Sequence, residues 1–338
     1  MLTRPPMAAP APVLAGDLSP EGAARRLIQG ERLLMRGRYG HGADIFLAID
    51  QLLPEPGPKA PYAVRREHLA RVRAAKLRLS VPIRDHQLAL KGAAPIGFLR
   101  ELYPETPDFE LALLHAQELR GAWEKYKEGT HLPVLGRRLH PFAGTYLPTR
   151  TEHLELFATW LSGYDGPKHQ AIDVGTGAGV LAFLLARAGF ERVLATDDNP
   201  NAIESVQRDL ARAEQPLPIE PRQADLMGED PPEADLVVFN PPWIPGEAAS
   251  LVERALYCPP ELMPRFFDRA VECMQPHTKL VLLYSNIGTL LRPDQPHPIQ
   301  AELEKGRLVL EQKLRRKVKP PKGKRTQEKV ELWVLAKA

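Results

Sequence analysis

The sequence contains little cysteine and no long hydrophobic run. Its two cysteines, Cys258 and Cys273, form neither a CxxC pair nor a metal-binding pattern, so we expect reduced thiols in a cytoplasmic protein. No apolar segment approaches the roughly 20 residues that a membrane helix needs. The ten histidines show no HExxH or other metal-ligand spacing. The sequence therefore predicts neither a metal site nor a membrane-spanning helix.

The sequence also lacks a strong excess of either charge. Its 45 basic and 42 acidic residues give a net charge of only +3, so the distribution of charge says more about partners than the total. A length of 338 residues allows two domains. The first 20 residues are too rich in proline for a signal-peptide core, and we expect them to form a disordered arm.

Residues 21–135 are predicted to form a mainly helical N-terminal domain. Leu27, Leu33 and Leu34 recur at helical intervals after Ser19, a suitable cap. Residues 63–79 predict a basic amphipathic helix. Residues 106–129 predict another helix, with Thr106 or Asp108 as its cap and Gly129 at its end.

Residues 136–338 alternate short apolar runs with helical patterns, which indicates an α/β domain with a parallel sheet covered on both faces. The last two runs have no helix between them and predict an antiparallel hairpin at the sheet edge. The runs predicted as buried strands are 169–174, 192–197, 235–240, 279–285, 306–314 and 329–337, with a weaker strand before Asp225.

A glycine-rich turn follows the first of these strands. Asp173, Gly175, Thr176, Gly177 and Gly179 lie in it, and in an open parallel sheet such a turn binds nucleotides. The dinucleotide fingerprint requires glycine where this chain has valine, three positions after Gly177. The spacing D-x-G-x-G-x-G instead resembles motif I of class I S-adenosylmethionine-dependent methyltransferases. This resemblance implies a Rossmann-like seven-stranded sheet and S-adenosylmethionine as cofactor; the alternative is a tight turn in another α/β protein.

Two acidic residues follow the next strands. Asp197 ends the second strand, where a carboxylate can accept hydrogen bonds from both ribose hydroxyls. Asp225 follows the third strand, and the same resemblance implies that it accepts from the adenine amino group. The alternative for Asp225 is an ordinary loop aspartate.

The segment Asn240-Pro241-Pro242-Trp243 ends the fourth strand. The Asn240 side chain and the Pro241 carbonyl can accept both N–H bonds of a planar NH2 group, the prolines fix the turn, and Trp243 offers a flat face. The segment resembles motif IV of the amino-methyltransferases, [DN]PP[YFW], in which the asparagine also lies beside the cofactor. The alternative is a Pro-Pro loop with a tryptophan in the core.

Residues 144–285 also resemble HemK-type glutamine methyltransferases, which modify peptide release factors. The resemblance rests on residues 144–161, similar to an "IPRPETE-L" segment, and on the sequence NPPWIP. It implies that Pro148, Arg150 and Glu152 lie over the cofactor pocket and that the acceptor is a glutamine amide.

A basic cluster near the C-terminus favours a polyanion such as RNA. A solvated loop explains the same residues. The cluster comprises Lys313, Arg315, Arg316, Lys317, Lys319, Lys322, Lys324 and Arg325.

Four functions therefore compete. The first is N-methylation of a protein glutamine amide, and the second is N-methylation of a nucleobase amine in rRNA or tRNA. A non-catalytic cofactor-binding RNA or ribosome factor and a small-molecule methyltransferase are the others. In the first three, the partner belongs to the translation machinery. The sequence identifies no target position, oligomeric state or activating subunit.

Overall fold

The computed structural model describes residues 2–11, 13–15, 17–57, 60–148, 150–248, 251–319 and 327–338. The chain forms two compact units, Leu2–Lys125 and Tyr126–Ala338. In the described part of the chain, no helix combines the length and the apolar character needed to cross a membrane. The glycine turn and the NPPW segment both lie in the second unit, which therefore contains the predicted site.

The first unit combines helices with a small sheet. Its helices are α1 (Pro20–Ile28), α2 (Tyr39–Leu52), α3 (Tyr62–Leu77), α4 (Phe98–Leu102) and α5 (Leu113–Glu128), the last of which continues into the second unit. Its strands are β1 (Val13–Leu14), β2 (Leu33–Leu34), β3 (Leu79–Arg84), β4 (Gln87–Leu88) and β5 (Phe109–Ala112). Ser19 caps α1 as predicted, because its Oγ accepts a hydrogen bond from the Gly22 amide.

Two predicted helices of this unit are shorter than expected. Leu33 and Leu34 do not extend α1 but pair with β3, opposite Leu79 and Ser80. The helix expected from residue 106 begins only at Leu113, because the preceding residues form β5 and pair with β3. Tertiary pairing thus overrides the local helical pattern. The same helix ends before Gly129, which has the positive φ of a C-terminal glycine.

The prediction of a disordered arm over residues 1–20 does not hold for those of them that the structure describes. The Arg4 guanidinium donates to the Leu102 carbonyl, and the Ala8 amide donates to the Glu110 carbonyl. The Pro5 carbonyl accepts from the buried Tyr103 hydroxyl. These hydrogen bonds hold the described part of the arm within the first unit.

In the described part of the second unit, seven strands form one sheet in the order β10-β9-β8-β11-β14-β16-β15. The first five are mutually parallel, whereas β16 runs antiparallel to both β14 and β15. This confirms the predicted sheet and its closing hairpin. The strands are β8 (Gln170–Val174), β9 (Arg192–Asp197), β10 (Ile219–Gln223), β11 (Leu236–Phe239), β14 (Lys279–Ser285), β15 (Leu308–Lys317) and β16 (Lys329–Lys337).

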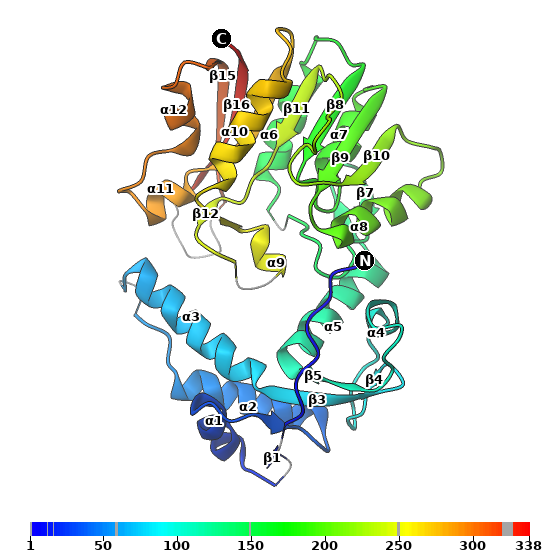
Figure 1. Ribbon diagram of the computed structural model, residues 1–338, viewed down its shortest axis with the longest axis vertical. Coiled ribbons are helices and arrows are strands. Elements are labelled where there is room, and N and C mark those ends of the chain that lie inside the picture. The colour runs from blue at the N-terminus through cyan, green and yellow to red at the C-terminus, as the bar shows by residue number, and fades with distance from the viewer. Residues whose placement is uncertain are drawn as a thin grey trace. The chain divides into compact units, whose positions relative to one another are not determined.

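Helices cover both faces of the sheet (Figure 1). Along β8, Ala171 packs on one face and Ile172 on the other, as expected for a strand buried on both sides. One face packs against α6 (Glu152–Ser162), α7 (Val180–Arg187) and α8 (Pro200–Ala211). The other packs against α10 (Leu262–Cys273) and α12 (Pro298–Leu303).

Short elements complete the unit and lie mainly in its connections. They are the paired strands β6 (Thr130–Leu132) and β7 (Arg137–Leu139), the paired strands β12 (Ile244–Pro245) and β13 (Tyr257–Cys258), and helices α9 (Leu251–Arg254) and α11 (Ile287–Leu291). The strand order reverses between β8 and β11, and such a switch point opens a crevice at the carboxyl ends of the strands. The fold therefore predicts a ligand site at this crevice.

Candidate functional site

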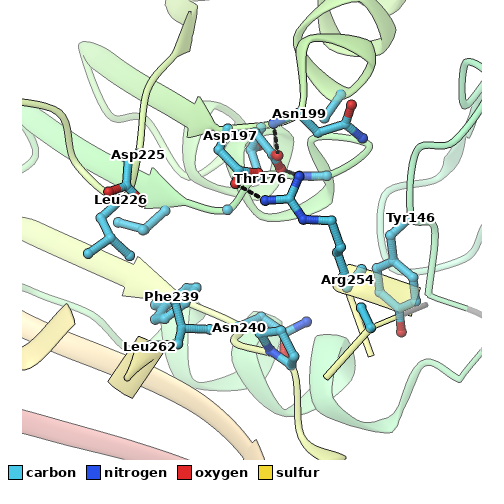
Figure 2. Close-up of a pocket in the computed structure, with 18 of the residues that line it drawn as sticks. Tyr146, Thr176, Asp197, Asn199, Asp225, Leu226, Phe239, Asn240, Arg254 and Leu262 are labelled. Atoms are coloured by element: carbon cyan, nitrogen blue, oxygen red, sulfur yellow. Dashed lines mark hydrogen bonds and ion pairs between the residues drawn. The ribbon is translucent and has the colours of Figure 1, made fainter. Parts of the chain in front are cut away.

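A cavity of about 460 Å³ lies at the carboxyl ends of β8, β9 and β11. This volume is within the range of small-molecule and cofactor sites. Figure 2 shows Asp225 and Leu226 at one end and Tyr146 at the other, with Asp197 and Asn240 on opposite sides between them. The structure thus brings the glycine turn, two of the predicted acidic residues and Asn240 together around one cavity.

The glycine turn depends on backbone conformations that favour glycine. Gly175, Gly177 and Gly179 have φ values of +63°, +53° and +83°. A Cβ atom on Gly177 would lie 3.1 Å from the carbonyl oxygen of Tyr146. That carbonyl accepts a hydrogen bond from the Ala178 amide. The segment before α6 is therefore fixed directly on the turn, and both line the cavity.

Asp173 holds the glycine turn through hydrogen bonds and does not face the cavity. It is 1% exposed, and its Oδ2 accepts from Thr176 Oγ1 at 2.6 Å and from the Ala182 amide at 2.9 Å. Burial raises the pKa of this carboxyl to about 7. Asp173 is absent from the described residues that line the cavity, whereas Gly175, Thr176 and Gly177 are present. The expectation of direct cofactor binding by Asp173 is therefore replaced by a role in holding the turn.

Asp197 does line the cavity, and its carboxylate is fixed by two backbone amides. Gly177 N lies 2.9 Å from Oδ2, and Asn199 N lies 2.9 Å from Oδ1. Burial raises the pKa of this carboxyl to about 6, although the two amides and Arg254 favour its charged form. A carboxylate has about four acceptor positions, so two remain for a ligand's hydroxyl groups.

Asp225 also lines the cavity but already has a partner. Its carboxylate forms an ion pair with Arg265. The neighbouring wall carries a similar pair, in which Asp198 binds Arg254. Neither arginine was predicted from the sequence, because each lies far along the chain from its aspartate and in no recognisable motif.

Asn240 and Pro242 line the cavity at the end of β11. The Oδ1 atom of Asn240 is buried and has no hydrogen-bond partner among the described residues. A buried acceptor without a donor costs about 1–3 kcal/mol, so natural structures rarely keep one without a functional reason. The side chain therefore has acceptor capacity available for a ligand's N–H group.

Trp243 is partly buried against the core and is absent from the described residues that line the cavity, contrary to our expectation of a stacking face. It packs against both core clusters, and its Nε1 donates to the Leu283 carbonyl at 3.2 Å. Its ring meets the buried His153 ring edge-on, with centroids 5.0 Å apart. Burial lowers the pKa of His153 to about 4, so this imidazole is neutral at pH 7. Trp243 therefore attaches the Asn-Pro-Pro turn to the core.

Replacing Trp243 with alanine is expected to lower the free energy of unfolding by about 3 kcal/mol, because the ring fills space in the core. Trp243→Phe keeps a ring beside His153 and should cost about 1 kcal/mol through loss of the hydrogen bond to Leu283. Urea unfolding of both variants measures these losses. A Trp243→Ala protein as stable as wild type but inactive would instead indicate direct contact with substrate.

The predicted lid residues Arg150 and Glu152 join the C-terminal hairpin instead of the cavity. Arg150 pairs with the buried Glu328, and Glu152 accepts a hydrogen bond from the Lys319 amide at 3.0 Å. Of the described residues in this segment, Gly144, Tyr146, Pro148 and Leu154 line the cavity. The segment thus covers the site as expected, but through its apolar and aromatic residues.

The basic cluster is partly neutralised by acids from other elements. Arg315 lies 3.0 Å from Glu331 on the next strand, and Arg316 pairs with Glu155 of α6. Lys317 and Lys319 are exposed beyond them. Strand β16 begins at the carboxyl edge of the parallel sheet, because Val330 pairs with Ser285 at the end of β14. Lys322, Lys324 and Arg325 lie outside the described residues.

Comparison with known proteins gives the cavity a family context. Residues 155–286 match the family model described as methyltransferase small domain. The ribosomal protein L11 methyltransferase of Heliobacterium modesticaldum is 35% identical over 124 residues, 36% of this chain and 38% of that protein. The release factor glutamine methyltransferase of Koribacter versatilis is 37% identical over 144 residues, 41% of this chain and 50% of that protein.

Among solved structures, the ribosomal protein L11 methylase of Lactobacillus delbrueckii subsp. bulgaricus is similar, with a TM-score of 0.41 and 18% identity over 63% of this chain and 93% of that chain. The curated relatives match over only about a third to a half of their length.

The cavity fits the cofactor of such a domain. Asp197 retains acceptor positions for hydroxyl groups, the turn at Gly177 lets a ligand approach the backbone, and no phosphate cradle is needed. Among the described residues, no group of three or more His, Cys, Asp or Glu is placed to hold a metal ion. Residues 155–286 thus resemble a methyltransferase small domain and lie on a sheet of the class I methyltransferase type, and the cofactor of such a domain is S-adenosylmethionine.

Proposed function

We propose that the protein is an S-adenosylmethionine-dependent N-methyltransferase that modifies the glutamine amide of a protein of the translation machinery in the cytoplasm. The observation that carries this proposal is the buried Oδ1 of Asn240 in the wall of the cofactor cavity, for which no described residue supplies a hydrogen-bond donor. An amide NH2 group supplies the donor that this oxygen lacks.

The residues of the chain would hold the acceptor rather than activate it chemically. Asn240 Oδ1 accepts one N–H bond, and the Pro241 carbonyl is the proposed acceptor for the other. Holding both protons directs the nitrogen lone pair towards the cofactor, which when bound supplies an electrophilic methyl group. The contribution to rate is then positioning and preorganised acceptors for the positive charge that develops on nitrogen.

Two observations favour a protein acceptor. The curated relatives bear the names of enzymes acting on ribosomal protein L11 and on a release factor. In addition, Arg315 and Arg316 are engaged by Glu331 and Glu155, so these two charges are less available to phosphate. The relative named for glutamine methylation and the NPPWIP sequence favour the amide within this class.

A nucleobase amine is the second candidate. Lys317 and Lys319 are exposed near the carboxyl edge of the sheet, where they could bind phosphate beside the acceptor. A planar exocyclic NH2 group would satisfy Asn240 equally well. A non-catalytic factor is the third candidate and is disfavoured by the unpartnered Asn240.

The acceptor class is tested by transferring labelled methyl from S-adenosylmethionine into extract of cells that lack the protein. Each sample is divided between protease and nuclease. Label removed by protease supports the proposal and directs the search to glutamine-containing translation factors. Label removed by nuclease overturns it in favour of RNA, and no label above a control without the protein overturns enzymatic activity itself.

A further inference from the structure

Two arginines of one segment reach aspartates at the ends of two different strands. The segment comprises residues 251–265, which include α9, β13 and the start of α10, and we call it the wall segment. Its Arg254 pairs with Asp198, the residue after β9. Its Arg265 pairs with Asp225, which follows β10.

The wall segment contributes several residues to the lining of the cofactor cavity. Its lining residues are Arg254, Ala255, Tyr257, Pro259, Glu261, Leu262 and Arg265. Figure 2 shows the Arg254 side chain extending from this segment towards Asp197 and Asn199. The ion pair with Asp198 therefore crosses from one wall of the cavity to the other. A ligand that enters or leaves between these walls has to pass the two pairs.

The wall segment is anchored at its α10 end, where Met263 is buried in the core and Leu262 packs against it. Its backbone is tied to the NPPW segment, since Ile244 N donates to the Leu256 carbonyl and Gly246 N donates to the Cys258 carbonyl. These bonds hold the segment on the β11 side. In contrast, the described bonds towards Asp198 and Asp225 are made by arginine side chains.

The two pairs are too exposed to serve mainly for stability. The side chains of Arg254 and Asp198 are 54% and 47% exposed, and those of Arg265 and Asp225 are 51% and 61% exposed. Exposed ion pairs contribute little to folding and are weakened by salt. Such contacts form and break readily, which suits a contact that must open for a ligand.

We propose that Arg254 and Arg265 are positioning residues that clasp the wall segment over bound S-adenosylmethionine and slow its release. Each clasp joins the segment to the end of one strand, Asp198 at β9 and Asp225 at β10. This goes beyond the transfer reaction, because it concerns retention of the cofactor and of its demethylated product.

Arg254 has a second effect that supports this role. Its charge lowers the pKa of the buried Asp197, opposing burial and the neighbouring Asp198, which both raise it. Asp173, beneath the glycine turn, is the other acid that interacts with Asp197. Arg254 therefore favours the charged carboxylate that accepts hydrogen bonds from the ligand.

The test measures binding of S-adenosylhomocysteine by surface plasmon resonance at pH 8. Arg254→Gln and Arg265→Gln are each expected to raise the dissociation rate constant about two- to fivefold, and the double variant about tenfold. Asp198→Asn should match Arg254→Gln, and combining these two should add nothing, because they break the same pair. In wild type, the dissociation rate should rise with sodium chloride, and this rise should be smaller in the double variant.

Arg222→Gln is the matched control. Arg222 forms an exposed pair with Glu220 of similar exposure, but neither residue lines this cavity. Its dissociation rate should equal that of wild type, and all variants should unfold within about 2 °C of wild type without ligand. Unchanged dissociation in the Arg254 and Arg265 variants would overturn the proposal. Failure of wild type to bind S-adenosylhomocysteine would instead overturn the cofactor assignment.

Discussion

Replacing Asn240 with alanine is expected to reduce methyl transfer at least about 100-fold while leaving cofactor binding nearly unchanged. The magnitude follows from removing one preorganised polar group that acts on the charge developing at the reacting atom. Cofactor affinity should change little, because the Asp197 carboxylate and the glycine turn remain intact. Initial rates with labelled S-adenosylmethionine measure the first quantity, and titration calorimetry with S-adenosylhomocysteine measures the second.

Asn240→Asp provides the conservative comparison. The aspartate keeps an acceptor oxygen at nearly the same position, so we expect more activity than in Asn240→Ala. The alanine variant removes a buried oxygen that no residue in the described ranges satisfies, so its stability should equal or exceed that of wild type. Methyl transfer at the wild-type rate in a folded Asn240→Ala protein would refute the role assigned to this side chain.

The fold of the second unit was predictable because its signals are local. Each buried strand of the parallel sheet is a short apolar run, and the turn after β8 has glycines with positive φ. The missing helix between β15 and β16 correctly indicated the antiparallel hairpin. In such a sheet, the turns after the strands share one edge, so the convergence of Asp197 and Asn240 on one cavity followed from the order of elements.

The sheet of the first unit was not predictable in this way. Strand β2 has two residues, and its partner in β3 lies 46 positions along the chain, since Leu33 pairs with Leu79. Strands of this length have no period that could be recognised, and the residues of β5 fit a helical pattern equally well. Their conformation depends on which distant segment they meet.

The ion-pair partners of charged side chains could not be predicted from the sequence either. Arg315 lies directly opposite Glu331 in the hairpin register, although 16 positions separate them. The basic cluster was apparent from the local sequence, whereas its acidic partners come from another strand and from α6. The position of Trp243 was mistaken for a similar reason. A tryptophan after a turn can face a cavity or the core, and contacts with His153 and β14 decide between them.

Replacing Asp197 with alanine is expected to weaken cofactor binding about 100-fold. The residue is the candidate acceptor for two ribose hydroxyls, and a hydrogen bond to a charged group contributes about 1.5–3 kcal/mol. Asp197→Asn keeps the shape of the side chain but exchanges one acceptor oxygen for a donor, so its binding should fall between those of alanine and wild type. Calorimetric titration with S-adenosylhomocysteine at pH 8 measures both.

The pH dependence of binding gives a sharper test of Asp197. Its pKa is raised to about 6, so the carboxylate is charged at pH 8 and becomes protonated as the pH falls through 6. Wild-type affinity should therefore fall between pH 7 and pH 5, because a protonated carboxyl offers fewer acceptor positions. The ionisable groups of the ligand are the same in both measurements. The difference in binding affinity between wild type and Asp197→Asn at each pH therefore reports on this residue. If this difference in affinity stays constant from pH 8 to pH 5, either the raised pKa or the contact between Asp197 and the ribose is excluded. The affinity of Asp197→Ala at pH 8 decides between them, because it falls only if the contact exists.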